Sequence, residues 1–299
     1  MTEIAFFGAV EIGLVYALVA LGVFLSFRVL DFPDLTVDGS FPLGAAVAAT
    51  LIVAGANPWL ASLAAVAAGA AAGLVTAVLN VRFRILHLLA SILTMIALFS
   101  VNLRVMGKPN VAILMQDTVL TPFYGLGLPE HIVRPLFVAV VVLAVVALLA
   151  RFLASEFGLA MRATGVNARM ARAQGVETDT HLYFGIALSN GLVGLAGALF
   201  AQTNGFADVT TGIGTIVVGL AAVIVGETVL PLRGMAGALV ACVVGSILYR
   251  LAVQFALSAD AIGLQASDLN LVTAVLVAVA LILPRMKMRA ASPVAKVAK

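Results

Sequence analysis

The sequence predicts an all-α membrane protein, a polytopic bundle of about nine transmembrane helices. Of its 299 residues, 63% are hydrophobic and only 10% are charged, and the mean hydropathy is +1.17. Soluble domains carry about 25% charged residues, so this composition excludes a soluble enzyme and a disordered chain. Long unbroken apolar runs such as residues 136–150 favour helices, because the strands of a membrane barrel alternate in polarity over about ten residues.

Nine apolar segments account for the expected spans, and a helix needs about 20 apolar residues to cross the hydrocarbon core. Glycines and prolines interrupt several of them, which leaves the number between eight and ten. We expect one membrane domain over residues 1–299, with the first span retained because Met1–Ile4 lacks the basic start of a cleaved leader. The segments are residues 5–27, 37–54, 58–80, 85–106, 133–153, 180–202, 213–230, 234–257 and 268–284.

Lysine and arginine are concentrated in alternate loops, and such loops are cytoplasmic in most membrane proteins. This pattern predicts an external N-terminus, a cytoplasmic C-terminal tail over residues 285–299 and an external loop over residues 107–134. The external loop is either a docking surface for an outside protein or a simple connector. The basic loop residues are Arg28, Arg82, Arg84, Arg151, Arg162, Arg169, Arg172, Arg233 and Arg285.

One segment inside the membrane domain, residues 155–180, reads as soluble and is too polar to cross a bilayer. It predicts two short helices. Ser155 is expected to cap the first helix and Asn167 the second, since both side chains can accept from free N–H groups. Gly165 is expected to interrupt the helical pattern, and Gly175 to end the second piece.

The second short piece carries Ala168, Ala171 and Gly175 at helical spacing, which gives it one smooth face. Two interpretations fit such a helix. It either lies on the lipid headgroups with its arginines outward, or it inserts into a groove on a cytoplasmic protein. The pattern alone does not choose between them.

The same segment resembles the cytoplasmic loop of ABC importer permeases of the branched-chain amino acid and ribose type. The resemblance implies a coupling helix region seated in a cleft of a cytoplasmic ATP-binding subunit. It also implies two such subunits, a second permease chain (a homodimer), a periplasmic or lipid-anchored substrate-binding protein, and a place in the bacterial inner (plasma) membrane. The residues that carry it are Glu156, Phe157, Gly158, Arg162, Ala163, Asn167, Ala171, Gly175 and Val176.

The N-terminal stretch is similar to a subgroup of that family, the tryptophan/tyrosine transport permeases. Tyr16-Ala17-Leu18 and the run from Leu30 to Phe41 carry this similarity, which implies a small amino-acid-like and aromatic cargo. Branched-chain permeases have Asn-Phe-Ala-His where this chain has Asp31 to Asp34. Their cargo therefore does not transfer to this chain.

Two short segments of the chain match each other, residues 32–36 (FPDLT) and 206–210 (FADVT). Each precedes a glycine-interrupted apolar segment, and five spans separate them. An odd number of spans reverses direction, so the match predicts an inverted repeat, an architecture typical of transporters.

Polar side chains at the repeats are the candidates for a translocation pathway. An ionised carboxylate costs roughly 2.5–3.5 kcal/mol at a helix centre, so it must face water, a cation or a helix N-terminus. We expect Asp34 and Asp38 in the cytoplasmic half and Asp208 in the outer half. For Asp38 and Asp208 we expect capping of the helix that follows each in preference to contact with the cargo, although the two roles are compatible. The full set is Asp34, Thr36, Asp38, Ser40, Asn190, Gln202, Asp208 and Thr210.

Two further polar groups have structural interpretations. Asn102 lies within a span and is expected to form a hydrogen bond to a neighbouring helix. Asn190 and Gln202 are expected either to form such interhelical bonds or to line a pore. Glu227 is expected to pair locally with Arg233 or, alternatively, to contact the ATP-binding subunit.

The sequence contains no phosphate-binding G-x-x-x-x-G-K-[ST] loop, no His-Glu-x-x-His motif and no metal-ligand spacing. We therefore expect no enzymatic activity, cofactor or metal in this chain. The rival interpretation is an ion-coupled secondary transporter that uses Asp34, Asp38 and Asp208 as coupling carboxylates. It explains the acids and the repeat but leaves the polar segment at 155–180 unexplained.

Overall fold

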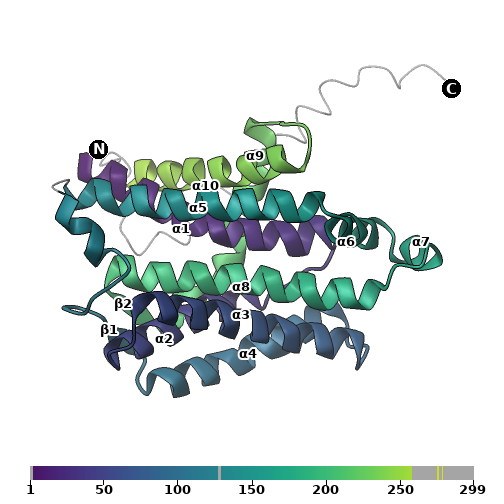
Figure 1. Cartoon of the computed structure of the whole chain (residues 1–299), viewed down its shortest axis with the longest axis horizontal. Coiled ribbons are helices and arrows are strands. Elements are labelled where there is room, and N and C mark those ends of the chain that lie inside the picture. The colour runs from purple at the N-terminus through teal and green to yellow at the C-terminus, as the bar shows by residue number, and fades with distance from the viewer. Residues whose placement is uncertain (1–2, 127–128, 258–274, 276–277, 279–299) are drawn as a thin grey trace.

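A computed structural model describes residues 3–126, 129–257, 275 and 278 of the chain. Long helices run side by side along one axis, α6 and α7 project from one end, and β1 and β2 lie at the other (Figure 1). These ends are called the α6–α7 end and the β1–β2 end below. The helices are α1 Glu3–Val23, η1 Phe24–Val29 (a π-helical turn), α2 Val37–Val53, α3 Pro58–Val81, α4 His87–Met106, η2 Thr121–Leu126, α5 Glu130–Ala154, α6 Glu156–Val166, α7 Ala168–Ala173, α8 Thr178–Asn204, η3 Val209–Gly212, α9 Thr215–Val229 and α10 Met235–Leu257, and the strands are β1 Asn110–Ala112 and β2 Phe206–Asp208.

Seven of the described helical segments are long and apolar enough to cross a membrane, which confirms the all-α polytopic class. α2 is apolar but has only 17 residues. At 1.5 Å per residue it spans about 25 Å, less than the roughly 30 Å of the hydrocarbon core. The expected number of nine spans is therefore approximate, and the candidate at 268–284 lies outside the described residues.

α1 and α8 form the centre of the bundle and run in opposite directions (Figure 1). Their backbones approach at Gly22, where a Cβ atom would lie 2.7 Å from the carbonyl oxygen of Ser189. The Ser189 hydroxyl donates to the carbonyl oxygen of Gly22 at 2.7 Å. Small residues of this kind allow close helix packing in lipid, where burial of apolar surface contributes little.

Each central helix has an equivalent antiparallel partner. α3 packs along α8, and α10 packs along α1. α3 starts at the β1–β2 end, where Ser62 bonds to Gln202 of α8. α10 runs in the opposite direction, so that its Ser246 bonds to Gly13 near the start of α1. Exchanging α1 with α8, α2 with α9 and α3 with α10 thus reproduces the packing with direction reversed, as an inverted repeat requires.

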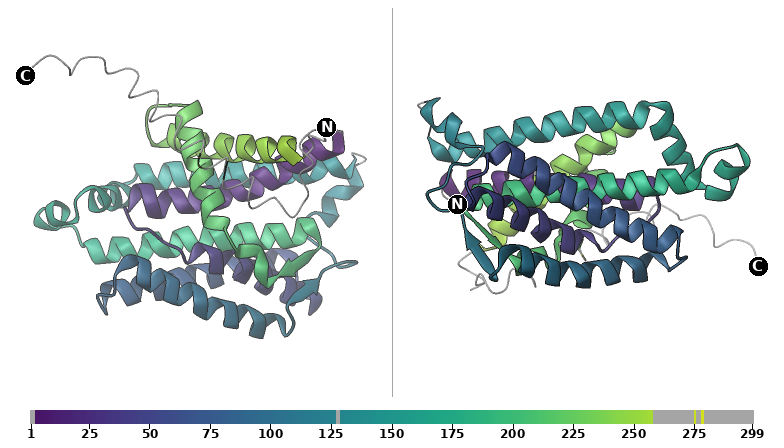
Figure 2. Two further views of the ribbon diagram at one scale, coloured as in Figure 1. Left: turned by 180° about the vertical axis from the view of Figure 1, so that it is seen from behind. Right: turned by 60° about the horizontal axis from the view of Figure 1, so that its bottom comes forward.

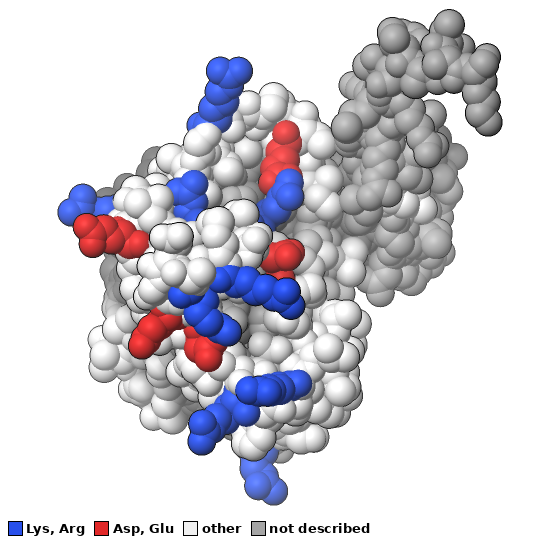
Figure 3. Space-filling view, turned by 90° about the vertical axis from the view of Figure 1, so that its right-hand side faces the viewer, with Lys and Arg blue, Asp and Glu red and all other residues white. Residues whose placement is uncertain are grey.

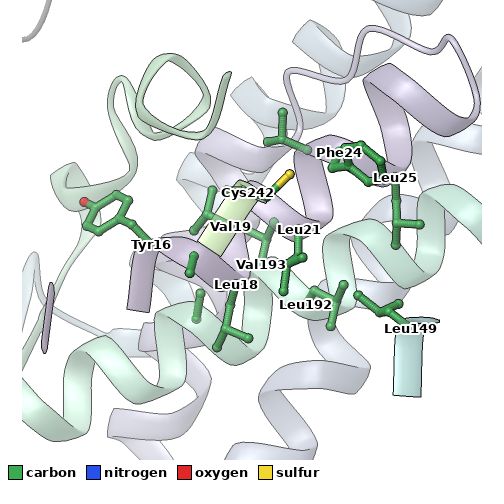
Figure 4. Packing of buried hydrophobic residues seen from close by; sticks show 14 of the residues in the cluster. Tyr16, Leu18, Val19, Leu21, Phe24, Leu25, Leu149, Leu192, Val193 and Cys242 are labelled. Carbon is green, nitrogen blue, oxygen red and sulfur yellow. The ribbon is translucent and has the colours of Figure 1, made fainter. Parts of the chain in front are cut away.

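The largest core cluster lies where these helices meet (Figure 4). Leu18 and Leu21 of α1, Val193 of α8 and Cys242 of α10 are fully buried there. Figure 2 (left) shows α9 crossing the bundle steeply to the long helices, from the layer of α2 and α3 to that of α10. This core fixes the two helix breaks that form the candidate site.

Candidate functional site

The first helix break is the segment between η1 and α2, which turns back into the bundle so that α2 starts in the interior. Asp34 is fully buried at this break. Its Oδ1 accepts from the backbone N–H of Thr36 at 2.9 Å, and its Oδ2 accepts from Nδ2 of Asn190 at 2.6 Å. The carboxylate therefore holds the start of α2 against the middle of α8.

Hydrogen bonds extend this contact into an interior network. The Ser40 hydroxyl donates to Oδ1 of Asn190 at 2.7 Å, and the hydroxyls of Thr36 and Thr76 lie 2.7 Å apart. Four of the expected pathway residues, Asp34, Thr36, Ser40 and Asn190, are thus brought together. All four are fully buried, so in this conformation they join helices and line no open passage.

Gln202 lies apart from this network, near the β1–β2 end. Its Nε2 donates to the hydroxyl of Ser62 at 2.9 Å, and its Oε1 accepts from the N–H of Val119 at 3.1 Å. Only 4% of the residue is exposed. Here Gln202 attaches α8 to α3 and to the loop over residues 107–134.

The second helix break lies between α8 and α9, at the β1–β2 end. Asp208 accepts from the backbone N–H of Thr210 at 2.7 Å, which is the same turn that Asp34 makes with Thr36. Asp208 also accepts from Asn110 of β1 at 3.2 Å. The Thr210 hydroxyl, followed by the Thr210 N–H and Asn110, lowers the pKa of Asp208, because all three donate to the charged form.

The expectation that Asp38 caps the helix that follows it is wrong. Asp38 lies in the first turn of α2, and its carboxylate caps α9 instead, accepting from the N–H groups of Gly214 at 3.1 Å and Ile216 at 2.7 Å. A Cβ atom on Gly212 would lie 2.0 Å from the carbonyl oxygen of Asp38. The starts of α2 and α9 therefore meet at Asp38, away from Asp34.

A pocket of about 380 Å³ opens beside Asp38, between α2, α4 and η3. Its walls are largely apolar, and sequence reasoning assigned only Asp38 among its residues to a pathway. Asn102 bonds between helices as expected, since its Nδ2 donates to the carbonyl oxygen of Gly39 at 3.2 Å. Its Oδ1 has no hydrogen-bond partner. The lining includes Asp38, Pro42, Met95, Phe99, Asn102 and Ile213.

The segment 155–180 forms the two expected short helices, α6 and α7, outside the long bundle (Figure 1). The Ser155 hydroxyl accepts from the N–H of Gly158 at 3.3 Å, and Asn167 caps α7 by accepting from Met170 at 3.0 Å. The chain turns after α7 at Gly175, with φ of +86°. The interruption expected at Gly165 is wrong: Gly165 lies inside α6, and the break falls at Asn167, where the backbone is extended.

Gly165 has a packing role. A Cβ atom there would lie 1.9 Å from the carbonyl oxygen of Val29 and 2.9 Å from Cα of Leu30. α6 therefore rests directly on the backbone that leads from η1 into the first helix break.

The exposed residues of α6 and α7 differ from the expected coupling set. Gly158 and Ala171 are buried against their own chain, so they support the shape of the segment. Glu156, Asn167 and Gly175 are exposed, whereas Arg162, Ala163 and Val176 are half-buried. The residues missed from sequence are Val166 and Met170, whose side chains are 85% and 53% exposed at the tip.

Arginines surround this tip, and Figure 3 shows basic side chains grouped over the α6–α7 end, with fewer acidic ones among them. Arg172 pairs with Asp179 at 3.0 Å and donates to the Thr178 hydroxyl. Glu227 also lies near this end, and its local pairing with Arg233 is wrong. Its partner is Arg28 of η1, at 2.6 Å.

The described residues contain no group of three or more His, Cys, Asp or Glu side chains able to hold a metal ion. What they do contain is a multi-pass helical bundle with two broken helices that meet inside it. This is the architecture of a transporter subunit.

Comparison with known proteins gives the family. Residues 5–284 match the family described as the branched-chain amino acid transport system / permease component, and the chain belongs to it. ABC permeases of this kind associate with ATP-binding and substrate-binding components. No solved structure matches the chain.

Three relatives are informative. The chain is 34% identical over 265 residues to a tyrosine transport system permease protein of Clostridioides difficile, covering 88% of this chain and 86% of the relative. It is 36% identical over 201 residues to an uncharacterized protein of Rickettsia prowazekii, covering 67% and 69%. It is 30% identical over 164 residues to a guanosine ABC transporter permease protein of Bacillus subtilis, covering half of each.

Proposed function

We propose that this chain is the membrane subunit of an ABC importer for a small amino-acid-like solute, and that α6 and α7 couple it to an ATP-binding subunit. The observation that carries the proposal is the exposed tip formed by Val166 and Met170. Large apolar side chains on a projection outside the spans favour a protein partner. Arginines around the tip suit a partner with acidic groups at its rim.

The direction of the chain follows from its charges. Arg28, Arg82, Arg84 and Arg151 all lie at the α6–α7 end together with the arginines of α6 and α7. By the positive-inside rule this end is cytoplasmic. The N-terminus and the β1–β2 end are then external, and a further span over residues 268–284, as expected from the sequence, would make the tail over residues 285–299 cytoplasmic. The membrane is the bacterial inner membrane.

Motion of the ATP-binding subunits reaches the interior through Gly165. Because α6 sits on the backbone of Val29 and Leu30, a displacement of α6 moves the segment that leads to Asp34 and α2. α2 in turn carries Asp38, which holds the start of α9. A push at the tip is thus delivered to both helix breaks. Each ligand acts only through its different affinity for the inward and outward states.

The remaining partners follow from the family. We propose a homodimer of this chain with two ATP-binding subunits, and a substrate-binding protein that docks on the β1–β2 end near the loop over residues 107–134. Selectivity can then reside in the binding protein. The tyrosine transport relative supports an aromatic amino acid as cargo, while the guanosine relative keeps a nucleoside as the competing class.

Charge at the tip tests the coupling role. Met170→Glu should lower co-purification of the ATP-binding subunit and ATP-dependent uptake by at least about tenfold, because it places a carboxylate in an apolar contact. Met115→Glu is the matched control for co-purification, since Met115 is a fully exposed methionine in the loop at the β1–β2 end. Equal co-purification of the ATP-binding subunit with both variants would refute coupling through α6 and α7.

The ion-coupled alternative is tested in the same vesicles. It requires uptake that follows a proton or sodium gradient and continues without ATP. In this structure Asp34 is fully buried and bonded to Asn190, which favours a structural role for that carboxylate.

A further inference from the structure

The pocket beside Asp38 combines apolar walls with hydrogen-bond acceptors. Phe99 and Met95 of α4 and Ile213 after η3 supply the apolar surface. Three polar residues, Asp38, Ser100 and Asn102, also line the pocket. A volume of about 380 Å³ falls within the range of small-molecule sites.

Asn102 is the first sign that something occupies this pocket. The residue is fully buried, and its Nδ2 donates to Gly39 while its Oδ1 accepts nothing. A buried acceptor without a partner costs about 1–3 kcal/mol. Asn102 forms part of the pocket wall, and a donor bound in the pocket would recover that cost once the amide shifts toward the pocket to expose its Oδ1.

Asp38 is the second sign. Its two oxygens accept from Gly214 and Ile216, but each carboxylate oxygen has two lone pairs, so it can accept another donor. A carboxylate that faces lipid is costly, whereas one that faces water or a cation is not. The mouth of this pocket is therefore better suited to an aqueous pathway than to acyl chains.

We propose that this pocket is a binding site on the translocation pathway for solutes that carry a protonated amine on an aromatic or apolar body. The ammonium group donates to Asp38 and Asn102, and the body packs against Phe99, Met95 and Ile213. The inference rests on the proposed function. It assigns the face formed by α2, α4 and η3 to the pathway, and it adds Asn102, Ser100 and Phe99 to the residues that the cargo meets.

Thiol labelling of the full chain in membrane vesicles tests access to the pocket. The Ser100→Cys variant is made in a Cys242→Ala background, which removes the single native thiol. Relative to a small free thiol in solution, we expect it to prefer cationic trimethylammonium-ethyl methanethiosulfonate over the anionic sulfonatoethyl reagent by at least about tenfold, because Asp38 attracts cations. Asp38→Asn should abolish this preference while still capping α9, since asparagine is also a good cap.

A lipid-facing control distinguishes water from acyl chains. Val140 of α5 is exposed on a helix that is mostly unburied. Val140→Cys should react slowly with both reagents. If Ser100→Cys is equally slow, the pocket holds lipid and the proposal is overturned.

Protection of Ser100→Cys from labelling by small molecules tests whether the pocket recognises a protonated amine. Tyrosine and tyramine should slow labelling of Ser100→Cys, whereas 3-(4-hydroxyphenyl)propionate, which has the same ring but no amine, should not. Adding Asn102→Ala should raise the half-protecting tyramine concentration by about tenfold, the loss expected for a hydrogen bond to a charged group. Equal protection by the propionate, or no effect of Asn102→Ala, would show that the pocket does not bind amines.

The labelling needs neither ATP nor a partner, so the two proposals fail separately. If amines fail to protect Ser100→Cys while ATP-dependent uptake is intact, only the proposed amine site is refuted. If amines protect Ser100→Cys but Met170→Glu leaves uptake unchanged, only the proposed coupling role of α6 and α7 is refuted.

Discussion

The two helix breaks share a sequence motif and a turn, yet they differ in what surrounds them. At the first break Asp34 is fully buried and bonded to Asn190 in the middle of α8. At the second, Asp208 makes the same turn at the end of the bundle, where it meets Asn110 and solvent. The shared motif therefore fixes the local backbone geometry, while burial in the bundle decides how much the carboxylate contributes to the stability of the fold.

The break at α9 is also stabilised differently. Asp208 caps the short η3 turn and not α9. The start of α9 is capped by Asp38, which belongs to the other half of the chain. One repeat thus supplies the cap that the other lacks. The symmetry of the fold is broken where the two halves meet.

The largest effect should follow removal of the buried acid. Asp34→Ala leaves the N–H of Thr36 without an acceptor and leaves the Nδ2 of Asn190 with only the carbonyl oxygen of Ile186, so we expect a loss of about 2–4 kcal/mol of unfolding free energy. A thiol-reactive dye that reports exposure of buried Cys242 on heating measures it. Asp208→Ala is the matched control, and equal losses in the two variants would mean that the motif rather than its burial matters.

A smaller effect is expected from the shared cap. Asp38→Ala removes the acceptor for Gly214 and Ile216 and should cost about 0.5–2 kcal/mol, the usual range for a lost helix cap. Asp38→Asn should retain most of that stability in the same melting measurement. If Asp38→Ala melts like the unmodified chain, the contact between the two repeats does not stabilise α9.

The smallest effect belongs to the exposed acid and depends on pH. The pKa of Asp208 is lowered from its ordinary value of 3.8, so its stabilisation is present above that value and is lost as pH falls further. We expect less than about 0.5 kcal/mol, since the group is solvent-screened. Melting of the unmodified chain and Asp208→Asn should converge as the pH falls from 3.8 through the lowered pKa of Asp208, and a difference that grows on acidification would contradict this assignment.

Composition and apolar run length were sufficient to predict the class of fold, because a chain this poor in charge has few other solutions. Ser155 and Asn167 identified the two short helices, since their capping chemistry is local. The helix break predicted at Gly165 was wrong, because the sequence does not distinguish a glycine that ends a helix from one that lets a neighbouring backbone pack closely.

Long-range partners were beyond sequence reasoning. The pairing of Glu227 with Arg28 and the bond from Asp38 to α9 join residues more than 170 positions apart. The pocket residues Phe99 and Ser100 carry no local signal, because an apolar helix with a serine is ordinary in a membrane. The exposed Val166 and Met170 read as ordinary helix residues until the direction of α6 and α7 was known.

The glycine seam between α3 and α8 has a mechanical consequence. At Gly69 and Gly73 the neighbouring carbonyl oxygens lie so close that even a methyl group would not fit. Helices in such contact have no layer of side chains between them to rearrange, so sliding would break many contacts at once. We expect α3 and α8 to move together as one stiff unit when the chain changes conformation.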